Sequence, residues 1–495
     1  MKLFHNAKFW HKGSFSNDVK AILTKQGKIE KLLNHIPEDT QNIQRVDLKN
    51  SYVYPGFIDT HTHSFEGGLY SLMIDLREAR SIKEVLDMIR EGSQNKGKFV
   101  FAWNFDENRI EEKRFPTRAE LNSVVRDKNL VLRRVDGHSC AINSFACFNL
   151  KSAFRTIRCD TDIQRGLEND TIVHWFHNNI DSELILRSYH AASDLAIKGG
   201  FTTIHTMVGD ANMSIGHYSL LLDHLNDFAV DYVLYPQSFN IEAALEVGAK
   251  RIGGCILADG SIGSYTAALF EPYQGLPIRG NLYQTDAYWY DFISRAHQNN
   301  LQVAVHCIGD RAINQINTVY MALANSDFRD LRHQLIHCEI TDDTLINHIK
   351  ASQAVPVVQP MFDQLWGGEN GFYARALGKE RSQIMNRFSA MVTKGITITG
   401  SSDWYITDLD IRKELDAAMN HHNPAERLTP AQAIDLYTKN AAWLSHDEAL
   451  KGQIKEGLYA DFTILNYDLA HPVANPLIAA IIKRAEVIHE NFPTE

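Results

Sequence analysis

The chain has 495 residues, of which 44% are hydrophobic and 22% are charged, and its formal net charge is −10. This composition is typical of a globular protein, and the acidic excess argues against nucleic acid as a partner. No apolar run approaches the ~20 residues that cross a bilayer, and the N-terminal segment lacks the apolar core of a signal peptide. We therefore expect a cytoplasmic protein that has no membrane partner.

Short strands and turns characterise both ends of the chain. They fill residues 1–54, and the segment "GQIKEGLYADFTILNYD" returns to the same pattern near the C-terminus. We predict that residues 1–54 and 446–495 together form one small β-sandwich domain. Residues 55–445 then form a separate domain.

The middle of the chain alternates apolar strands with amphipathic helical stretches, which is typical of βα units around a parallel sheet. Strand candidates occur at residues 56–62, 200–207, 230–236, 252–260, 301–309, 332–340, 353–360 and 395–404. Eight such units predict an α/β fold of the (β/α)8 TIM-barrel class. The long interval after the first strand contains two more apolar runs, so we predict an inserted α/β lobe over residues 69–169.

Metal-binding residue types recur where the predicted strands end. The first strand ends in His61 and His63, whose spacing of two directs both imidazoles to the same face. His306, His337 and Asp403 end the fifth, sixth and eighth strands. A single histidine of this kind is usually a hydrogen-bonded core residue. Four strands that share the feature predict a metal site at the C-terminal face of the barrel.

Four histidines and one carboxylate suit Zn²⁺, and manganese, iron and nickel are alternatives. A metal lowers the pKa of a bound water and polarises a carbonyl. A carboxylate beside that water can accept its proton and later pass it to the leaving group, and Asp403 is the candidate for this role.

Several motifs resemble those of one known family. The stretches "PGFIDTHTH", "LADGSIGSYTAAL", "AVHCIGDRAI" and "GSSDWYI" are similar to the amidohydrolase superfamily, in particular to the branch that contains N-substituted formamide deformylase and uncharacterised metal-dependent hydrolases. The resemblance spans nearly the whole chain. It implies that His61, His63 and Asp403 ligate one metal, and that His306 and His337 ligate a second or help to hold a single one.

At one position the chain departs from its relatives. The family commonly carries a carboxylated lysine that bridges two metals from the fourth strand, and Cys255 stands at this position. Lys250 lies at the start of the strand, at the wrong end of the barrel. We expect a thiolate ligand from Cys255, because a zinc-bound cysteine is deprotonated. The alternative is that Cys255 only packs and that the site holds one metal.

The resemblance also suggests residues that contact a substrate. His138, in "DGHSCAINS", binds substrate or stabilises an oxyanion, and the alternative is that it caps a turn. Asp259 either binds substrate or caps its loop. Gln359 and Trp366 follow the seventh strand, where aromatic residues form either an apolar cavity wall or a packed loop. Glu339 is expected to orient a histidine rather than to act directly.

Together these residues predict a metal-dependent hydrolase of a non-peptide, amide-like C–N bond in a small molecule. A metal-activated water attacks the carbonyl, Asp403 transfers the proton to the leaving nitrogen, and the metal with His138 stabilises the oxyanion. The alternatives are esterase, lactonase or deaminase chemistry at the same site, or a binding barrel without activity. The intact ligand set argues against the binding barrel. A homodimer is an expectation from the resemblance alone.

Overall fold

The computed structural model describes residues 1–15, 18–38, 42–94, 97–135, 139–154, 156–209, 214–471 and 473–492. The chain divides into two compact units: unit 1 comprises Met1–Ser64 and Ser193–Glu495, and unit 2 is Phe65–Ala192. The predicted lobe, 69–169, falls within unit 2, and the exact domain boundaries stay predictions. None of the described helices combines the length and apolar character that crossing a bilayer requires.

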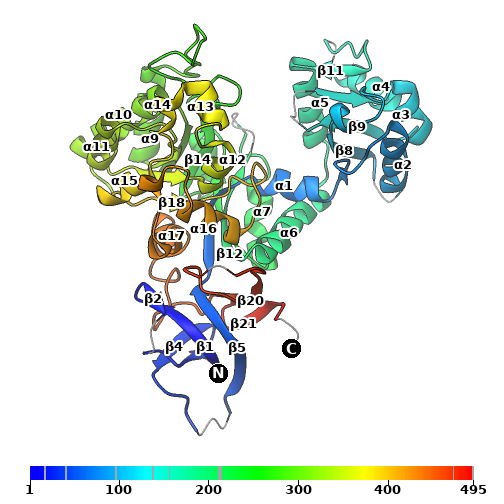
Figure 1. Cartoon of the computed structure of the whole chain (residues 1–495). Helices are drawn as coiled ribbons and strands as arrows, with labels where there is room; N and C mark the ends of the chain where they lie inside the picture. Colours follow the sequence, from blue (N-terminus) through cyan, green and yellow to red (C-terminus); the bar gives the residue numbers. More distant parts are fainter. Residues whose placement is uncertain are drawn as a thin grey trace. The chain divides into compact units, whose positions relative to one another are not determined.

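Strands from both ends of the chain form one sheet in unit 1, where the blue and red strands lie together (Figure 1). The sheet has the order β21-β20-β19-β5-β1-β3-β4, and β2 pairs with β1. Its strands are β1 Lys2–His11, β2 Ser14–Phe15, β3 Ala21–Lys25, β4 Lys28–Leu33, β5 Gln44–Pro55, β19 Phe462–Leu465, β20 Ile478–Lys483 and β21 Glu486–Glu490. Phe4, Phe9 and Phe462 are buried in its core. The two ends therefore share one hydrophobic core, while the division into two layers of a sandwich stays a prediction.

Eight described parallel strands form two arcs inside unit 1, with orders β13-β12-β6 and β14-β15-β16-β17-β18. They are β6 Phe57–Thr62, β12 Phe201–Val208, β13 Asp231–Pro236, β14 Arg251–Leu257, β15 Gln302–Cys307, β16 Gln334–His337, β17 Val355–Val358 and β18 Thr399–Gly400. Each lies within one of the eight predicted strands or overlaps it. The arcs meet where the N–H of Asp403 donates to the carbonyl of His61 at 3.1 Å, and where the Gln237 amide donates to the carbonyl of Cys255 at 3.1 Å. The fold is of the α/β barrel type, although the strand ladder is not continuous at these two seams.

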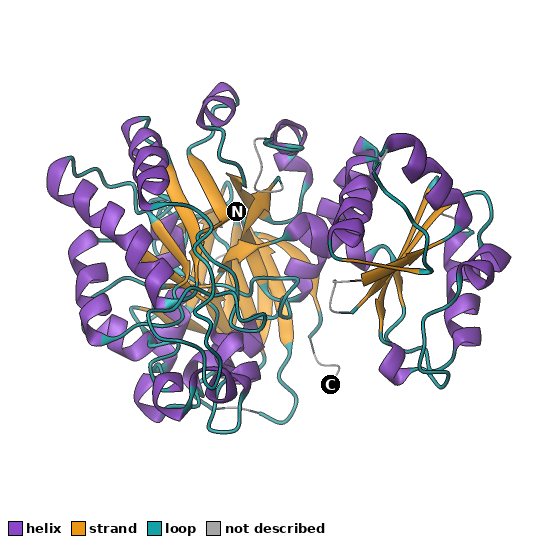
Figure 2. Cartoon of the chain, turned by 90° about the horizontal axis from the view of Figure 1, so that it is seen from above, coloured by secondary structure: helices purple, strands orange, loops and turns teal. Residues whose placement is uncertain are grey.

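Helices surround the strands of the barrel (Figure 2). They form because apolar residues recur at helical spacing: in α10, Ile313, Ile316 and Tyr320 are buried against the sheet. Thr285 caps α9 by accepting a hydrogen bond from the N–H of Tyr288. The helices of unit 1 include α7 Tyr218–Asp223, α8 Ile241–Glu246, α9 Asp286–Gln298, α10 Asp310–Ser326, α11 Asp343–Ser352, α12 Pro360–Trp366, α13 Phe372–Leu377, α14 Lys379–Ser382, α15 Phe388–Thr393, α16 Ile411–Met419, α17 Pro430–Leu436 and α18 Lys439–Leu444.

Unit 2 has its own sheet and core. The sheet order is β11-β10-β9-β8-β7, and its core includes Val85, Val100 and Leu132. Its strands are β7 Ile74–Asp75, β8 Phe99–Phe105, β9 Asn129–Arg134, β10 Ser139–Ile142 and β11 Ile163–Arg165. Its helices are α2 Ile82–Ser93, α3 Arg118–Val124, α4 Ser144–Ala153 and α5 Leu167–Asn178, while α1 Ser64–Ser71 and α6 Ser182–Lys198 include its ends. Unit 2 is thus a compact α/β unit with a separate core.

Candidate metal centre

Four of the predicted ligands come together at the ends of β6, β14 and β18. One ligand atom from each of His61, His63 and Cys255 lies within 4.8 Å of the others. Oδ1 of Asp403 lies 3.2 Å from Nε2 of His61 and 3.3 Å from Nε2 of His63. Residues far apart in the sequence therefore converge because parallel barrel strands end at one face.

The two remaining predicted ligands lie beside this group, with the ring centroids of His306 and His337 4.5 Å apart. Nε2 of His306 donates to the carbonyl of Gly260 at 3.0 Å, so Nδ1 carries the lone pair when the ring is neutral. Burial lowers the pKa of this imidazole, but contact with Cys255 and Asp259 outweighs burial and raises the pKa to about 9. Nδ1 of His337 donates to Oε1 of Gln359 at 2.9 Å, which leaves the lone pair of Nε2 available. These outer hydrogen bonds fix the tautomers that a metal ligand needs.

Several buried atoms of this group have no partner in hydrogen-bonding geometry among the described residues. They are both ring nitrogens of His61, Nδ1 of His306 and Oδ1 of Asp403. Leaving buried polar atoms unsatisfied costs free energy, so native proteins usually provide a partner. A cation among these atoms would satisfy them, and nitrogen, sulfur and carboxylate donors suit a divalent transition metal. The residues present therefore fit a metal.

The same neighbours set the charges of Cys255 and Asp403. Burial raises the pKa of the Cys255 thiol, but contacts with the imidazoles of His306, His61 and His63 outweigh burial and hold the pKa well below its usual range. Burial likewise raises the pKa of the Asp403 carboxyl, and His61 and His63 reverse the effect and hold it below its usual value. In both groups the neighbouring imidazoles therefore favour the ionised form, which is the form that ligates metals.

Two of these residues have left-handed backbones. The φ angle is +73° at His337, the last residue of β16, and +53° at Asp403, just after β18. Such angles are uncommon for residues other than glycine, although histidine and aspartate tolerate them better than most. They turn the chain sharply at the barrel face, so that both side chains reach the site.

A cavity of about 630 Å³ opens above the candidate ligands. Its lining includes Trp366, which the sequence assigned to the substrate site, and Phe362 beside it. The full lining is His63, Cys255, Leu257, Ser261, Ile262, Gly263, His306, Ile308, His337, Glu339, Phe362, Trp366, Phe372, Tyr373, Arg375, Asp403 and Ile406. The metal-competent residues and an apolar wall thus share one small-molecule-sized cavity.

Asp259 and Gln359 lie behind this lining. The carboxylate of Asp259 is fully buried and accepts hydrogen bonds from the backbone N–H groups of Ala268 (2.8 Å), Ile308 (3.0 Å) and Gly309 (2.8 Å). These contacts favour the loop-capping alternative for Asp259. Gln359 accepts the hydrogen bond from His337. A role of Asp259 or Gln359 in substrate binding stays a prediction. His138 lies outside the described residues.

Sequence reasoning missed other lining residues. Tyr373 and Arg375 come from α13, which has no motif and no metal-ligand pattern that would have pointed to the site. Glu339 was expected only to orient a histidine, yet it lines the cavity while being 2% exposed. Burial raises the pKa of its carboxyl to about 7.

A second group of metal-competent residues lies beside α12. Asp363, His421 and His422 offer ligand atoms within 4.8 Å of one another. However, the N–H of Asn423 donates to Nδ1 of His421 at 3.0 Å, so the proton of the neutral ring sits on Nε2, which faces Oδ1 of Asp363 at 3.2 Å. A proton occupies the place where a metal needs a lone pair. The N–H of His422 also donates to Oδ2 of Asp363 at 2.9 Å, so this group anchors α12 by hydrogen bonds.

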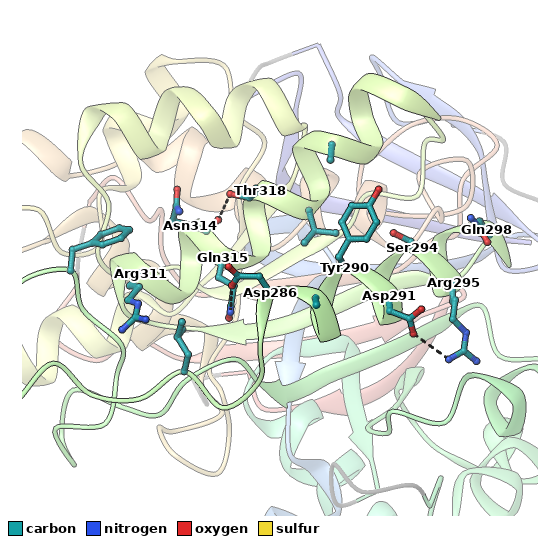
Figure 3. A pocket seen from close by; sticks show the side chains of 15 residues that line it. Asp286, Tyr290, Asp291, Ser294, Arg295, Gln298, Arg311, Asn314, Gln315 and Thr318 are labelled. Atoms are coloured by element: carbon teal, nitrogen blue, oxygen red, sulfur yellow. Dashed lines mark hydrogen bonds and ion pairs between the residues drawn. The ribbon is translucent and has the colours of Figure 1, made fainter.

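A separate hollow of about 780 Å³ lies between α9 and α10 (Figure 3). Gln315 donates to Asp286 at 2.6 Å, and Arg295 lies 3.6 Å from Asp291, so much of its polar lining is already paired. None of the residues predicted from the sequence for the site lines it. The residues predicted from the sequence thus gather at the cavity above the candidate metal ligands and not at this hollow.

Comparison with known proteins agrees with this geometry. The sequence profile of the amidohydrolase family matches residues 44–149 and 234–477. YtcJ of Bacillus subtilis (strain 168), which is named as an amidohydrolase, is 26% identical over 465 residues, covering 86% of each chain. N-substituted formamide deformylase of Arthrobacter pascens is 22% identical over 478 residues, covering 86% of this chain and 85% of the deformylase.

Solved structures share the fold. An uncharacterised metal-dependent hydrolase from Pyrococcus furiosus superposes with a TM-score of 0.80 at 22% identity, covering 95% of this chain and all of the other. A 5-methylcytosine deaminase from Klebsiella pneumoniae gives a TM-score of 0.59 at 15% identity, covering all of this chain and 98% of the deaminase. The family profile covers well over half of the sequence. The chain therefore belongs to the amidohydrolase family and is a hydrolase that acts on carbon–nitrogen bonds.

Proposed function

We propose that this protein hydrolyses the C–N bond of a non-peptide amide in a metal-dependent reaction. One observation carries the proposal: His61, His63, Cys255 and Asp403 converge at the floor of a cavity that is large enough for a small molecule. Metal-ligating side chains at the C-terminal face of a barrel are the usual arrangement of such catalytic sites.

The metal would be a divalent cation, most consistent with Zn²⁺ because histidine and cysteine dominate the donor set. His61, His63 and Asp403 would hold it, and Cys255, His306 and His337 would complete the site for one or two ions. When bound, such a cation lowers the pKa of a coordinated water and polarises a carbonyl oxygen.

The chain's own residues supply the proton transfers. Asp403 is the carboxylate beside the candidate ligands, with Oδ1 3.2 Å from Nε2 of His61 and 3.3 Å from Nε2 of His63, and from this position it would accept a proton from water. The same carboxylic acid then donates that proton to the leaving nitrogen. Gln359 keeps His337 in one tautomer through the 2.9 Å hydrogen bond. His138 is proposed to stabilise the oxyanion, as the sequence motif suggests.

The names of the relatives favour an amide over an ester. The deformylase from Arthrobacter acts on N-substituted formamides, and it matches this chain over most of its length. An amine also leaves poorly without protonation, so a carboxylic acid positioned beside the scissile bond is more useful for amides than for esters. We further propose that the two strand arcs close as a (β/α)8 barrel and that the end sheet folds as a small sandwich.

The test uses the purified protein with its metal removed by chelation and then restored with Zn²⁺, Mn²⁺, Fe²⁺ or Ni²⁺. Each form is assayed on N-substituted formamides and acetamides, on the matched esters, and on amino-heterocycles. We expect turnover of amides that disappears with the metal and returns with Zn²⁺. Turnover of only the esters or of only the amino-heterocycles would contradict the proposal.

A further inference from the structure

A row of aromatic rings forms one wall of the cavity. The ring of Phe362 stacks on His337 with centroids 5.8 Å apart and planes 15° apart. Trp366 follows at 4.6 Å from Phe362, and Tyr373 at 6.3 Å from Trp366. All four residues line the cavity. The wall therefore runs from a candidate metal ligand to α13, and it offers a surface for a flat apolar group.

A cation follows this wall on α13. Arg375 lines the same cavity and lies with its guanidinium carbon 5.7 Å from the centre of the Phe372 ring. One of its nitrogens, Nη1, donates to the carbonyl of Asn370 at 2.6 Å. Within the described ranges, no carboxylate lies within ion-pair distance of it. Its charge is permanent, because arginine is not deprotonated in proteins.

Arg381 on the next helix differs from Arg375 because each of its three side-chain nitrogens is engaged by the protein. Arg381 donates through Nε, Nη1 and Nη2 to the carbonyls of Leu377, Glu271 and Pro272, so its donors hold loops together. Arg375 keeps most of its donors available, although the two arginines lie on the consecutive short helices α13 and α14. An exposed arginine with spare donors beside a substrate cavity is suited to bind an anion.

The candidate metal ligands and Arg375 belong to different parts of the cavity lining. The ligands lie at the ends of barrel strands, whereas Arg375 lies on α13, and the aromatic row leads from His337 to Tyr373 of that helix. A substrate whose amide lies at the candidate ligands would therefore reach α13 with its other end. An anionic group at that end would be attracted by Arg375.

We infer that the substrate is an amide with a flat apolar body and a carboxylate at the end remote from the scissile bond. The aromatic wall binds the body, and Arg375 binds the carboxylate through paired N–H groups. The cavity volume of about 630 Å³ accommodates such a molecule. This inference rests on the proposed function, since it names the substrate class of the same site.

Two formamides that differ only at the remote end provide the test: 4-(formamidomethyl)benzoate and N-(4-methylbenzyl)formamide. We expect the Zn²⁺-loaded protein to show a kcat/KM about tenfold higher or more for the carboxylate, mainly through KM. Arg375→Gln should remove this preference. Lys379→Gln, which removes an exposed cation of α14 four residues away, should retain it.

Binding is measured separately by calorimetry with two unreactive ethers, 4-(methoxymethyl)benzoate and its 4-methyl counterpart. Equal or better turnover of the neutral formamide, or a preference that survives Arg375→Gln, would overturn the inference and leave the proposed function intact. If neither formamide is hydrolysed but the carboxylate ether binds more tightly and Arg375→Gln abolishes the difference, the anion site stands and amide hydrolysis fails. Neither turnover nor a binding preference would overturn both.

Discussion

The hydroxyl of Ser402 donates a hydrogen bond to Oδ2 of Asp59 at 2.5 Å, and its backbone N–H donates to both oxygens of the same carboxylate at 3.1 and 3.2 Å. Asp59 lies on β6, and Ser402 lies just after β18, so these bonds cross a seam of the barrel. Asp59 is two residues before His61, and Ser402 is one residue before Asp403. The contact therefore holds two candidate ligands from opposite ends of the barrel sequence in register.

Removing this carboxylate should destabilise the protein. Asp59→Ala leaves the buried donors of Ser402 and His61 without an acceptor, and we expect the free energy of unfolding to fall by about 3 kcal/mol. Urea unfolding of the mutant measures the loss. Asp160→Ala removes an exposed carboxylate and serves as the control, with an expected change of less than about 0.5 kcal/mol. Equal stability of the two variants would show that the seam contact does not support the fold.

Asp403→Asn should keep the fold and abolish turnover. The amide preserves the size of the side chain but cannot accept a proton from water at neutral pH, so we expect kcat to fall by about 100-fold or more. Circular dichroism establishes that the mutant is folded, and steady-state kinetics on an amide hydrolysed by the parent protein gives the rate. A mutant with near wild-type kcat would exclude Asp403 as the proton-transfer group.

The double variant His61→Ala, His63→Ala should lose its firmly bound metal. Both imidazoles come from the end of β6, so their removal takes away two neighbouring ligand candidates. The matched control is His421→Gln, His422→Gln, because that pair belongs to the hydrogen-bonded group around Asp363. Elemental analysis of both purified proteins gives metal per chain. Loss of metal from the second variant alone would move the centre to Asp363.

Cys255→Ser should weaken metal binding if the thiolate is a ligand. A serine hydroxyl does not ionise at neutral pH, so we expect a loss of affinity at least as large as the roughly 10- to 100-fold caused by losing an outer-shell partner. Competition with a chelator measures it. Cys140→Ser, at a buried cysteine of unit 2, is the control and should cost about 1–3 kcal/mol of stability with metal affinity unchanged. If Cys255→Ser behaves like the control, Cys255 only packs.

The contribution of Asp231 to stability should depend on pH. Burial raises the pKa of its carboxyl, but Lys451 and Lys483 outweigh burial and hold it below the ordinary value. Nζ of Lys483 lies 2.8 Å away and Nη2 of Arg484 lies 3.0 Å away. A carboxyl whose pKa is lowered by folding stabilises the protein above its unfolded pKa of about 4, and this contribution is lost as the pH falls below that value.

We therefore expect Asp231→Asn to lower the free energy of unfolding by about 3 kcal/mol at pH 7. The difference between wild type and mutant should shrink as the pH falls from about 4 toward 2, because the unfolded wild-type chain takes up a proton at Asp231 in this range while the folded protein, whose pKa is lowered, does not. Thermal unfolding of both proteins across this range provides the measurement. A difference that stays constant down to pH 2 would mean that the ion pairs do not contribute as described.

Much of the barrel and its ligands could be predicted because the responsible signals are local. The spacing of His61 and His63 follows directly from strand geometry, and an apolar run that ends in a polar ligand marks the strand end. The structure brings these residues together with Cys255 and Asp403. Their identity as metal ligands stays a prediction until metal is measured.

Other features depend on contacts that no local pattern encodes. Arg375 reaches the cavity because the chain after β17 folds through α12 and α13 before it returns to the sheet. Glu339 follows two left-handed residues, with φ of +73° at His337 and +51° at Cys338, so strand alternation no longer determines where its side chain points. Strand β18 spans only Thr399–Gly400, much less than the predicted 395–404, because the turn that positions Asp403 begins immediately afterwards.

The pairing of β5 has a consequence for synthesis of the protein. One edge of β5 pairs with β1, which is made earlier, but its other edge pairs with β19, about 400 residues later. At ribosomal speeds of about 5–20 residues per second, this edge waits roughly 20 to 80 seconds for its partner. Unpaired strand edges promote association between nascent chains. The nascent chain therefore has to be kept from associating through β5, which directly precedes the strand that carries His61, until the last part of the chain is made.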